Sequence, residues 1–248
     1  MGGIMRRSRW NKFIFGMVFW TLTYPFGILL GVLFHLLRIL KILRIRNLEY
    51  FPYFQKKLVL VSNHASLWDP IILVGLFFKQ YFFHPIRFCP WSTPDKGNYF
   101  DKWYWFFARP RFIPVPREEV HRVRTVMRSL VKIIRVLRNG GIVIFFPEGG
   151  RTFKGKTFLF SKKKKKVLRT LRSGIGDIVC KTNATVVPVW IEGAENVLPN
   201  NGAIIPRLWR KVTITIGKSM DYNHGAVLER KQITQEVSDA LLQLADED

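Results

Sequence analysis

The feature that most constrains the fold of this chain is one long apolar stretch near its N-terminus, from Phe13 to Leu37. Because a helix rises about 1.5 Å per residue, a stretch of this length would cover a bilayer core of about 30 Å. Pro25 lies at its centre, where a proline removes a backbone donor and clashes with the preceding turn. The stretch therefore predicts a membrane-embedded segment that is kinked near its middle.

Both flanks of this stretch are rich in cationic side chains. They are Arg6, Arg7, Arg9 and Lys12 before it, and Arg38, Lys41, Arg44 and Arg46 after it. A single span normally carries an excess of positive residues on its cytoplasmic side. Matched flanks instead favour a helical hairpin that is buried in one leaflet, with both ends at the headgroups. A true span and a cleaved signal are the alternatives. The signal is disfavoured because the stretch is too long and no small-x-small cleavage site follows it.

The charge balance indicates an anionic partner. The 248 residues carry 40 Lys and Arg against 17 Asp and Glu, a net charge of +23, yet 48% of the residues are hydrophobic. That much apolar material excludes a disordered basic tail, and the charge favours nucleic acid or a membrane surface. Because the chain is both basic and apolar, the membrane is favoured. Cys89 and Cys180 are too few for a disulfide framework.

From residue 58 onward, short apolar runs alternate with amphipathic segments. We expect strands at 58–62, 112–115, 142–146, 185–191 and 212–216, and helices at 70–78, 119–138, 172–181 and 226–245. The run Ile142–Phe146 does not alternate, which is typical of a strand that is covered on both faces. The pattern predicts an α/β fold with a largely parallel sheet flanked by helices.

The first cluster of reactive side chains lies between the strand at 58–62 and the helix at 70–78. His64 and Asp69 are five residues apart, about 140° around a straight helix and on opposite faces of a strand. They can therefore meet only where the chain turns. A histidine that donates one ring N–H to a carboxylate keeps its other nitrogen as a base near neutral pH. On spacing alone, the alternative is a helix capped by Asp69, with His64 an ordinary loop residue.

The second cluster directly follows the run Ile142–Phe146. It contains Glu148, Gly149, Gly150 and Arg151. Loops beyond the carboxyl ends of strands form the ligand crevice of open α/β sheets. The glycines would let the backbone approach a ligand, and the Arg151 guanidinium matches phosphate oxygens. Glu148 would suit a hydroxyl group or the positioning of an arginine. Taken alone, the pattern also fits a glycine turn with surface charges.

Together the two clusters contain a candidate base, an acid that could orient it and an arginine that could bind an anion, all in a chain with a predicted membrane segment. This combination suggests a hydroxyl nucleophile on a phosphate-bearing lipid. The sequence has no GxSxG elbow, so no acyl-enzyme is indicated. It also has no GxxxxGK[ST] loop, no GxGxxG and no Cys/His cluster with metal spacing. We therefore expect neither a metal nor a bound cofactor.

Four sequence blocks, in order, resemble those of the glycerolipid acyltransferases, the family of bacterial 1-acyl-sn-glycerol-3-phosphate acyltransferases. NHASLWD, from Asn63 to Asp69, resembles the signature NHxSxxD. RFIPVPR, which ends on Arg117, resembles the second block, and FPEGGRT, which begins at Phe146, resembles FPEGTRS. VPVWI, which begins at Val187, resembles the fourth block. Four blocks in order favour a functional role for both clusters over a capped helix and a glycine turn.

The resemblance implies transfer of an acyl chain from acyl-CoA or acyl carrier protein to the free hydroxyl of 1-acyl-glycerol-3-phosphate, giving phosphatidic acid. It also implies that His64 is the general base and Asp69 its orienting partner. The residues that would bind the acceptor are Asn63, Arg117, Glu148, Gly149, Gly150 and Arg151. The acyl thioester is a co-substrate, so the resemblance implies no cofactor. Gly150 in place of Thr and Arg111 in place of Gly depart from the family pattern and bear on the acceptor headgroup.

We accordingly expect a membrane-anchoring segment at residues 1–46 and an acyltransferase domain at residues 47–248. The domain would lie on the cytoplasmic face of the cell membrane, where acyl thioesters and acyl carrier protein are found. Beside a membrane, the lysine run Lys162–Lys166 is expected to contact anionic lipid, at about 1 kcal/mol per cation. The alternatives are another lysophospholipid or glycolipid acceptor, or a non-catalytic basic module that binds lipid or nucleic acid. No nucleic-acid motif accompanies the charge.

Overall fold

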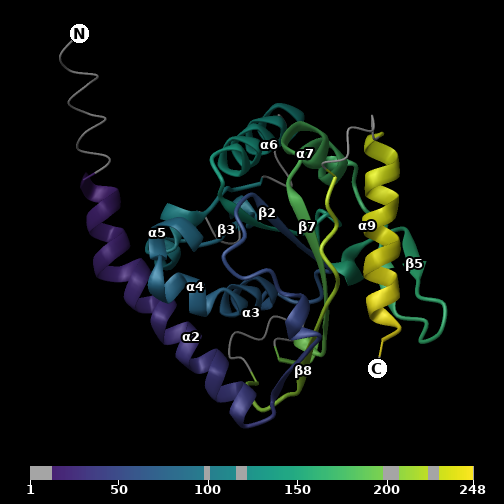
Figure 1. Ribbon diagram of the computed structural model, residues 1–248, viewed down its shortest axis with the longest axis horizontal. Helices are drawn as coiled ribbons and strands as arrows, with labels where there is room; N and C mark the ends of the chain where they lie inside the picture. The colour runs from purple at the N-terminus through teal and green to yellow at the C-terminus, as the bar shows by residue number, and fades with distance from the viewer. Residues whose placement is uncertain (1–12, 98–100, 116–121, 198–206, 223–228, 248) are drawn as a thin grey trace.

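The computed structural model describes residues 13–97, 101–115, 122–197, 207–222 and 229–247 (Figure 1). Within them, one six-stranded sheet has the strand order β1-β8-β7-β2-β4-β3. The strands are β1 (Leu43–Arg46), β2 (Leu58–Ser62), β3 (Trp91–Ser92), β4 (Ile142–Phe145), β7 (Thr185–Glu192) and β8 (Val212–Ile216). All neighbouring pairs are parallel except β7 and β8. The largely parallel sheet expected from the sequence is confirmed.

Helices cover both faces of this sheet. They are α2 (Tyr24–Ile39), α3 (Asp69–Leu76), α4 (Phe78–Phe83), α5 (Pro85–Phe88), α6 (Arg122–Arg138), α7 (Gly174–Thr182), α8 (Ala194–Val197) and α9 (Arg230–Ala245). Short 3-10 helices are η2 (Leu48–Tyr50), η4 (Trp103–Trp105), η5 (Arg109–Arg111) and η6 (Thr152–Lys154). Alternate residues of β2 face opposite cores, so that Leu60 packs with α2 and α3, and Val59 with α6, α7 and α9. Burial on both faces explains the unbroken apolar runs of the central strands.

The segment at 112–115 does not form the strand that we expected. It makes only isolated bridges, between Phe112 and Ser92 and between Val115 and Asp95. The neighbouring strand β3 has only two residues. A longer ladder therefore has no continuous partner along this edge of the sheet.

The N-terminal apolar segment is one helix, and the predicted hairpin is wrong. The helix runs from Phe13 to Ile39, with a π-helical turn, η1 (Phe19–Thr23), immediately before α2. Pro25 lies in the first turn of α2. Because a π-helical turn shifts the backbone hydrogen bonds by one residue, it accommodates the proline without reversing the chain. By length and composition alone, this helix is able to cross a membrane.

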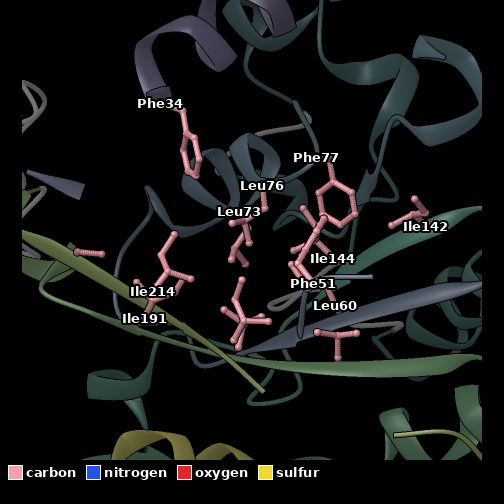
Figure 2. Close-up of a cluster of buried hydrophobic side chains, with 14 of the residues drawn as sticks. Phe34, Phe51, Leu60, Leu73, Leu76, Phe77, Ile142, Ile144, Ile191 and Ile214 are labelled. Carbon is pink, nitrogen blue, oxygen red and sulfur yellow. The ribbon is translucent and has the colours of Figure 1, made fainter. Parts of the chain in front are cut away.

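One side of α2 packs closely on α3 and α4. Gly31 of α2 lies against the ring of Phe78, and Gly75 of α3 lies against the ring of Phe34. A Cβ atom at these glycines would fall 1.8 Å and 2.2 Å from the two rings, so no larger residue fits there without displacement. Figure 2 shows Phe34 pointing from α2 toward the buried cluster that contains Leu73. The opposite side of the helix is apolar and exposed, and includes Leu29, Val32, Leu36 and Ile39.

Strand β1 joins this helix to the sheet. Its residues pair in parallel with β8, beginning with Leu43 opposite Val212. The expected boundary after residue 46 would thus separate β1 from the sheet to which it is hydrogen-bonded. The division into two domains stays a prediction, and the pairing of β1 favours a boundary just before Leu43.

The lysine run forms the turn of a small antiparallel hairpin, β5 (Phe158–Phe160) and β6 (Val167–Arg169). The backbone N–H groups of Lys163 and Lys164 donate to the Asp246 carboxylate, which ties the turn to the end of α9. Figure 1 shows this hairpin and α2 on opposite sides of the molecule. A flat bilayer that meets the exposed face of α2 would not reach the hairpin. The expectation that the run contacts lipid stays a prediction, and this placement argues against contact of both α2 and the run with one flat bilayer.

Candidate active site

The candidate site lies where two parallel neighbours, β2 and β4, end at the same edge of the sheet. The loop after β2 carries His64, and the loop after β4 carries Glu148. Adjacent parallel strands deliver their following loops to one edge, which is the usual crevice of open α/β sheets. The fold thus brings together the two clusters that the sequence placed 84 residues apart.

His64 and Asp69 meet, as the expected turn between them requires. The Nδ1 atom of His64 is 2.9 Å from Oδ2 of Asp69. The same oxygen accepts a hydrogen bond of 2.8 Å from the Ser66 backbone N–H. Asp69 is the first residue of α3, and Pro70 follows it in the first helical turn, where a proline is well tolerated. The start of α3 therefore sets the position of the carboxylate under the imidazole.

The hydrogen-bond partners of the dyad indicate the tautomer of His64. Oδ2 of Asp69 is a carboxylate acceptor, so Nδ1 carries the proton and donates it. Nε2 is then the basic nitrogen. The ring also stacks on Phe146, with centroids 4.4 Å apart. The side chain is only 4% exposed, so the imidazole is held from two directions and its orientation is fixed.

Asp69 is fully buried. Burial raises the pKa of this carboxyl above its ordinary value, against the opposing effect of the hydrogen bonds from His64 and Ser66. A buried carboxylate is stabilised by hydrogen bonds to its charged form. The hydrogen bonds from His64 and from the Ser66 and Ala65 backbone thus favour the charged form of Asp69 against the effect of burial.

Glu148 links the loop after β2 to the loop after β4 through hydrogen bonds. Its Oε1 accepts from the His64 backbone N–H at 2.7 Å and from the Thr152 hydroxyl at 2.9 Å. Its Oε2 accepts from the Arg169 backbone N–H at 3.2 Å. The side chain is fully buried, and burial raises the pKa of Glu148 to about 7. These contacts give Glu148 a positioning role, and its expected contact with the acceptor stays a prediction.

Thr152 is a member of the site that the sequence analysis did not single out. Its backbone N–H donates to the His64 carbonyl at 2.7 Å, and its hydroxyl lies between that carbonyl and Glu148. The residue closes the FPEGGRT block, so its place in that motif was the available signal. Phe146, the ring under His64, opens the same block. Both ends of this motif thus support the histidine loop.

The remaining candidate residues occupy different positions. The Asn63 side chain exchanges two hydrogen bonds of 2.8 Å with the Ile191 backbone, which links the end of β2 to β7. Gly149 has φ +66°, a conformation that suits glycine, and it lies against the Arg172 side chain. Gly150 is buried, and Arg151 is half-buried. Gly149, Gly150 and Arg151 thus lie in the loop that follows β4, whereas Asn63 lies at the end of β2 and contacts β7.

Arg117 lies outside the described residues, so its place in the site stays a prediction. Within the described part of the chain, no group of three or more His, Cys, Asp or Glu residues could hold a metal ion. The chemistry that the visible side chains support is proton transfer by a histidine that a carboxylate orients.

Comparison with known proteins identifies the family to which the chain is similar. The acyltransferase family model matches residues 42–192, more than half of the chain. The matched part contains the His64–Asp69 pair and the Glu148 clasp, and extends through β7.

Two curated plant proteins are similar to the chain. A chloroplastic 1-acyl-sn-glycerol-3-phosphate acyltransferase from Arabidopsis thaliana is 25% identical over 158 residues, which are 62% of this chain and 36% of that protein. Another from Brassica napus is 26% identical over 154 residues, 62% of this chain and 38% of that protein. The matched region thus spans little more than a third of each relative.

The fold is also similar to a solved structure. The crystal structure of the 1-acyl-sn-glycerophosphate (LPA) acyltransferase PlsC from Thermotoga maritima covers 97% of this chain, and the match covers 82% of that chain. The TM-score is 0.58 and the sequence identity 20%. This similarity concerns the fold.

Proposed function

Because the chain belongs to the acyltransferase family, we propose that it is a membrane-bound enzyme that converts 1-acyl-glycerol-3-phosphate to phosphatidic acid. The donor is acyl-CoA or acyl carrier protein, and no cofactor is needed. The observation that carries the proposal is the buried His64–Asp69 pair, joined at 2.9 Å and clasped by Glu148. The names of the plant relatives support the choice of acceptor.

The proposed reaction is a single displacement at the thioester carbonyl. Nε2 of His64 takes the proton from the acceptor hydroxyl as its oxygen attacks the carbonyl carbon. The C–S bond then breaks, the ester bond is complete, and the proton passes from the imidazolium to the departing thiolate. The Asp69 carboxylate stabilises the imidazolium while it exists and keeps the ring in the reactive tautomer.

The acceptor phosphate would be bound at the loop that follows β4. Arg151 is half-buried there, two residues after Gly149, which has a positive φ. A planar guanidinium binds phosphate oxygens through two parallel hydrogen bonds. Arg117 is the second proposed cation for the same phosphate.

We propose that the exposed side of α2 lies in one leaflet, with the enzyme on the cytoplasmic face. One side of the helix is packed on α3 and α4, so the helix does not leave the domain as an independent span. Its outer side is apolar, with Leu29 63% and Val32 54% exposed. Cytosolic acyl thioesters then reach a site whose acceptor resides in the bilayer.

A transfer assay tests the activity. Membranes or purified full-length protein in vesicles would receive a radiolabelled acyl thioester and a panel of lysophospholipid and glycolipid acceptors. We expect phosphatidic acid from lysophosphatidic acid, and a rate that is lower by about 10²–10⁴ for His64→Ala. His84→Ala is the matched control, because His84 is exposed and its ring contacts Phe54 and Phe88 away from the dyad. Wild-type turnover by His64→Ala would refute the mechanism, and transfer only to another acceptor would refute the substrate.

Vesicle flotation tests the membrane contact. Leu29→Lys with Val32→Lys should release the protein from vesicles, because both side chains would meet hydrocarbon. The control pair is Met127→Lys with Val131→Lys on α6, where the side chains are similarly exposed at 50% and 53%. Equal binding by both double variants would contradict the proposal.

A further inference from the structure

Residues 151–173 form a strongly cationic part of the chain. They contain ten Lys and Arg and no Asp or Glu. In the structure they include η6 and the β5–β6 hairpin, with the lysine run Lys162–Lys166 as its turn. A segment of this charge creates a positive surface potential, which favours an anionic partner.

The outer face of the hairpin is aromatic. Phe158 and Phe160 alternate with Leu159 along β5 and are exposed, with Phe160 at 58%. Leu159 pairs with Leu168, which is buried in the core, so the two phenylalanines lie on the face that points away from the protein. Exposed apolar side chains surrounded by polar ones are typical of surfaces that bind another macromolecule.

The lysine turn at the tip of the hairpin is held from two sides. The buried Ser161 accepts at its hydroxyl from the Lys166 backbone N–H and donates its own N–H to the Lys166 carbonyl, both at 2.9 Å. Asp246 accepts from two further backbone N–H groups of the turn. The residues Lys162–Lys165 are exposed on this turn. Because groups that are already ordered lose less freedom on binding, the arrangement favours a binding surface over a freely solvated loop.

The other end of the hairpin adjoins the candidate active site. The Arg169 backbone N–H, at the end of β6, donates to Oε2 of Glu148, and Oε1 of the same carboxylate accepts from the His64 backbone N–H. From Arg169 to Lys165 is four residues, at most about 13 Å of extended chain. A partner bound to the outer face of the hairpin would therefore be held close to the loops that carry the proposed base.

The position of the hairpin favours a soluble partner over a membrane. Figure 1 shows the hairpin and α2 on opposite sides of the molecule. With the exposed side of α2 in a bilayer, the hairpin faces the aqueous phase. An acidic protein would complement the lysine turn in charge and could cover Phe158 and Phe160 with its own apolar side chains. Of the two donors in the proposed function, only acyl carrier protein is a macromolecule with a surface that could do both.

We propose that the outer face of the β5–β6 hairpin, together with its lysine turn, is the docking surface for an acidic acyl carrier protein that delivers the acyl thioester. This inference rests on the proposed function and names the donor that this surface serves. The lysine side chains pair with carboxylates of the carrier, and Phe158 and Phe160 form the apolar centre of the contact. The arm of the carrier then extends along β6 toward the loop that Glu148 joins to His64.

A comparison of two donors tests the docking surface. Full-length protein in phosphatidylcholine vesicles would receive lysophosphatidic acid with either a palmitoylated bacterial acyl carrier protein or palmitoyl-CoA. Lys162→Glu with Lys165→Glu should lower kcat/KM for the carrier-bound donor about tenfold, mainly through KM, and should leave the value for palmitoyl-CoA within about twofold. The control pair is Lys132→Glu with Arg135→Glu on α6, which are also exposed and change the net charge equally. This pair should affect neither donor.

A binding measurement provides a test that does not depend on turnover. The probe is the same carrier protein with its palmitoyl chain attached through a thioether, titrated against the protein in phosphatidylcholine vesicles. Phe160→Ser should weaken binding about tenfold, whereas Met127→Ser on α6, where the side chain is similarly exposed at 50%, should not. A higher ionic strength should weaken binding more in the wild-type protein than in the lysine variant.

The outcomes separate this inference from the proposed function. Equal losses with both donors, or equal losses in the hairpin and α6 variants, would overturn the docking surface. Loss of flotation with anionic vesicles in the lysine variant, with carrier binding unchanged, would also overturn it and assign the turn to lipid. If the wild-type protein acylates lysophosphatidic acid from palmitoyl-CoA but does not bind the carrier, this inference fails and the proposed function stands. If it binds the carrier at the hairpin but acylates no acceptor, the proposed function fails and the docking surface stands.

Discussion

Asp69→Asn separates the electrostatic role of the carboxylate from its role as a hydrogen-bond acceptor. In the native site, Oδ2 accepts from His64 and from the Ser66 backbone N–H. The other oxygen, Oδ1, is buried and has no hydrogen-bond partner of good geometry among the described residues. The asparagine carbonyl can replace Oδ2, but its NH₂ group must then occupy the Oδ1 position.

This geometry gives the expected size of the effects. An NH₂ group without an acceptor at the buried Oδ1 position should lower the free energy of unfolding by about 1–3 kcal/mol. In the opposite orientation of the amide, its NH₂ group would face the two donors that now bind Oδ2, so this orientation is less favourable. Nδ1 of His64 can still donate to the asparagine carbonyl, and the tautomer is kept. The variant loses the negative charge that stabilises the imidazolium, and kcat should fall by about 10²–10⁴.

The assay is acyl transfer to lysophosphatidic acid in vesicles, combined with urea unfolding of the same preparations. We expect a lower kcat with little change in KM, because Asp69 touches neither substrate in the proposed reaction. The control is Asp177→Asn, which removes the charge of an aspartate that pairs with Arg230 on the surface. Wild-type kcat in Asp69→Asn, or an equal loss in Asp177→Asn, would refute the argument.

Three further predictions concern other parts of the chain. Arg151→Lys should raise KM for lysophosphatidic acid with little change in kcat, because an ammonium group cannot replace a bidentate guanidinium; an unchanged KM would transfer the phosphate role to Arg117. Burial raises the pKa of Glu148 from 4.5 to about 7. This shift contributes on the order of 3 kcal/mol to the free energy of unfolding below pH 4.5, and the contribution is lost as the pH rises through 7. Urea unfolding from pH 5 to 8 should therefore show a decline in the wild-type protein that is weaker in Glu148→Gln, and equal slopes would contradict this. Replacing Lys162–Lys166 by glutamines should leave flotation with anionic vesicles unchanged, whereas loss of binding would restore the lipid contact.

Local pattern was sufficient to predict the central strands, whereas the meeting of His64 with Asp69 was favoured only by the resemblance to the family blocks. The strand β2 has the predicted bounds, Leu58–Ser62, because its unbroken apolar run reflects burial on both faces. The edge strands were not predicted. β1 exists through pairing with β8, which brings Leu43 opposite Val212 from the far end of the chain. A four-residue run such as LRIR has no periodicity that would identify such a strand on its own.

The role of Glu148 shows the same limit within the site. A glutamate next to glycines and an arginine was interpreted as a ligand for the acceptor. Of its partners, the Thr152 hydroxyl lies within the motif, but the backbone N–H groups of His64 and Arg169 lie 84 and 21 residues away in the sequence. The local motif does not show which distant backbone groups will surround the carboxylate. It therefore identifies Glu148 as a site residue but does not predict the partners of its oxygens.

The apolar helix α2 contacts the dyad's helix, α3, directly. Asp69 begins this eight-residue helix, and Gly75, near its other end, lies against Phe34 of α2. Because no Cβ atom fits at Gly75, the two helices are in close contact, and a displacement of α2 would be transmitted along α3 to the carboxylate. A helix α2 with its outer side in the bilayer would therefore also set the position of the base.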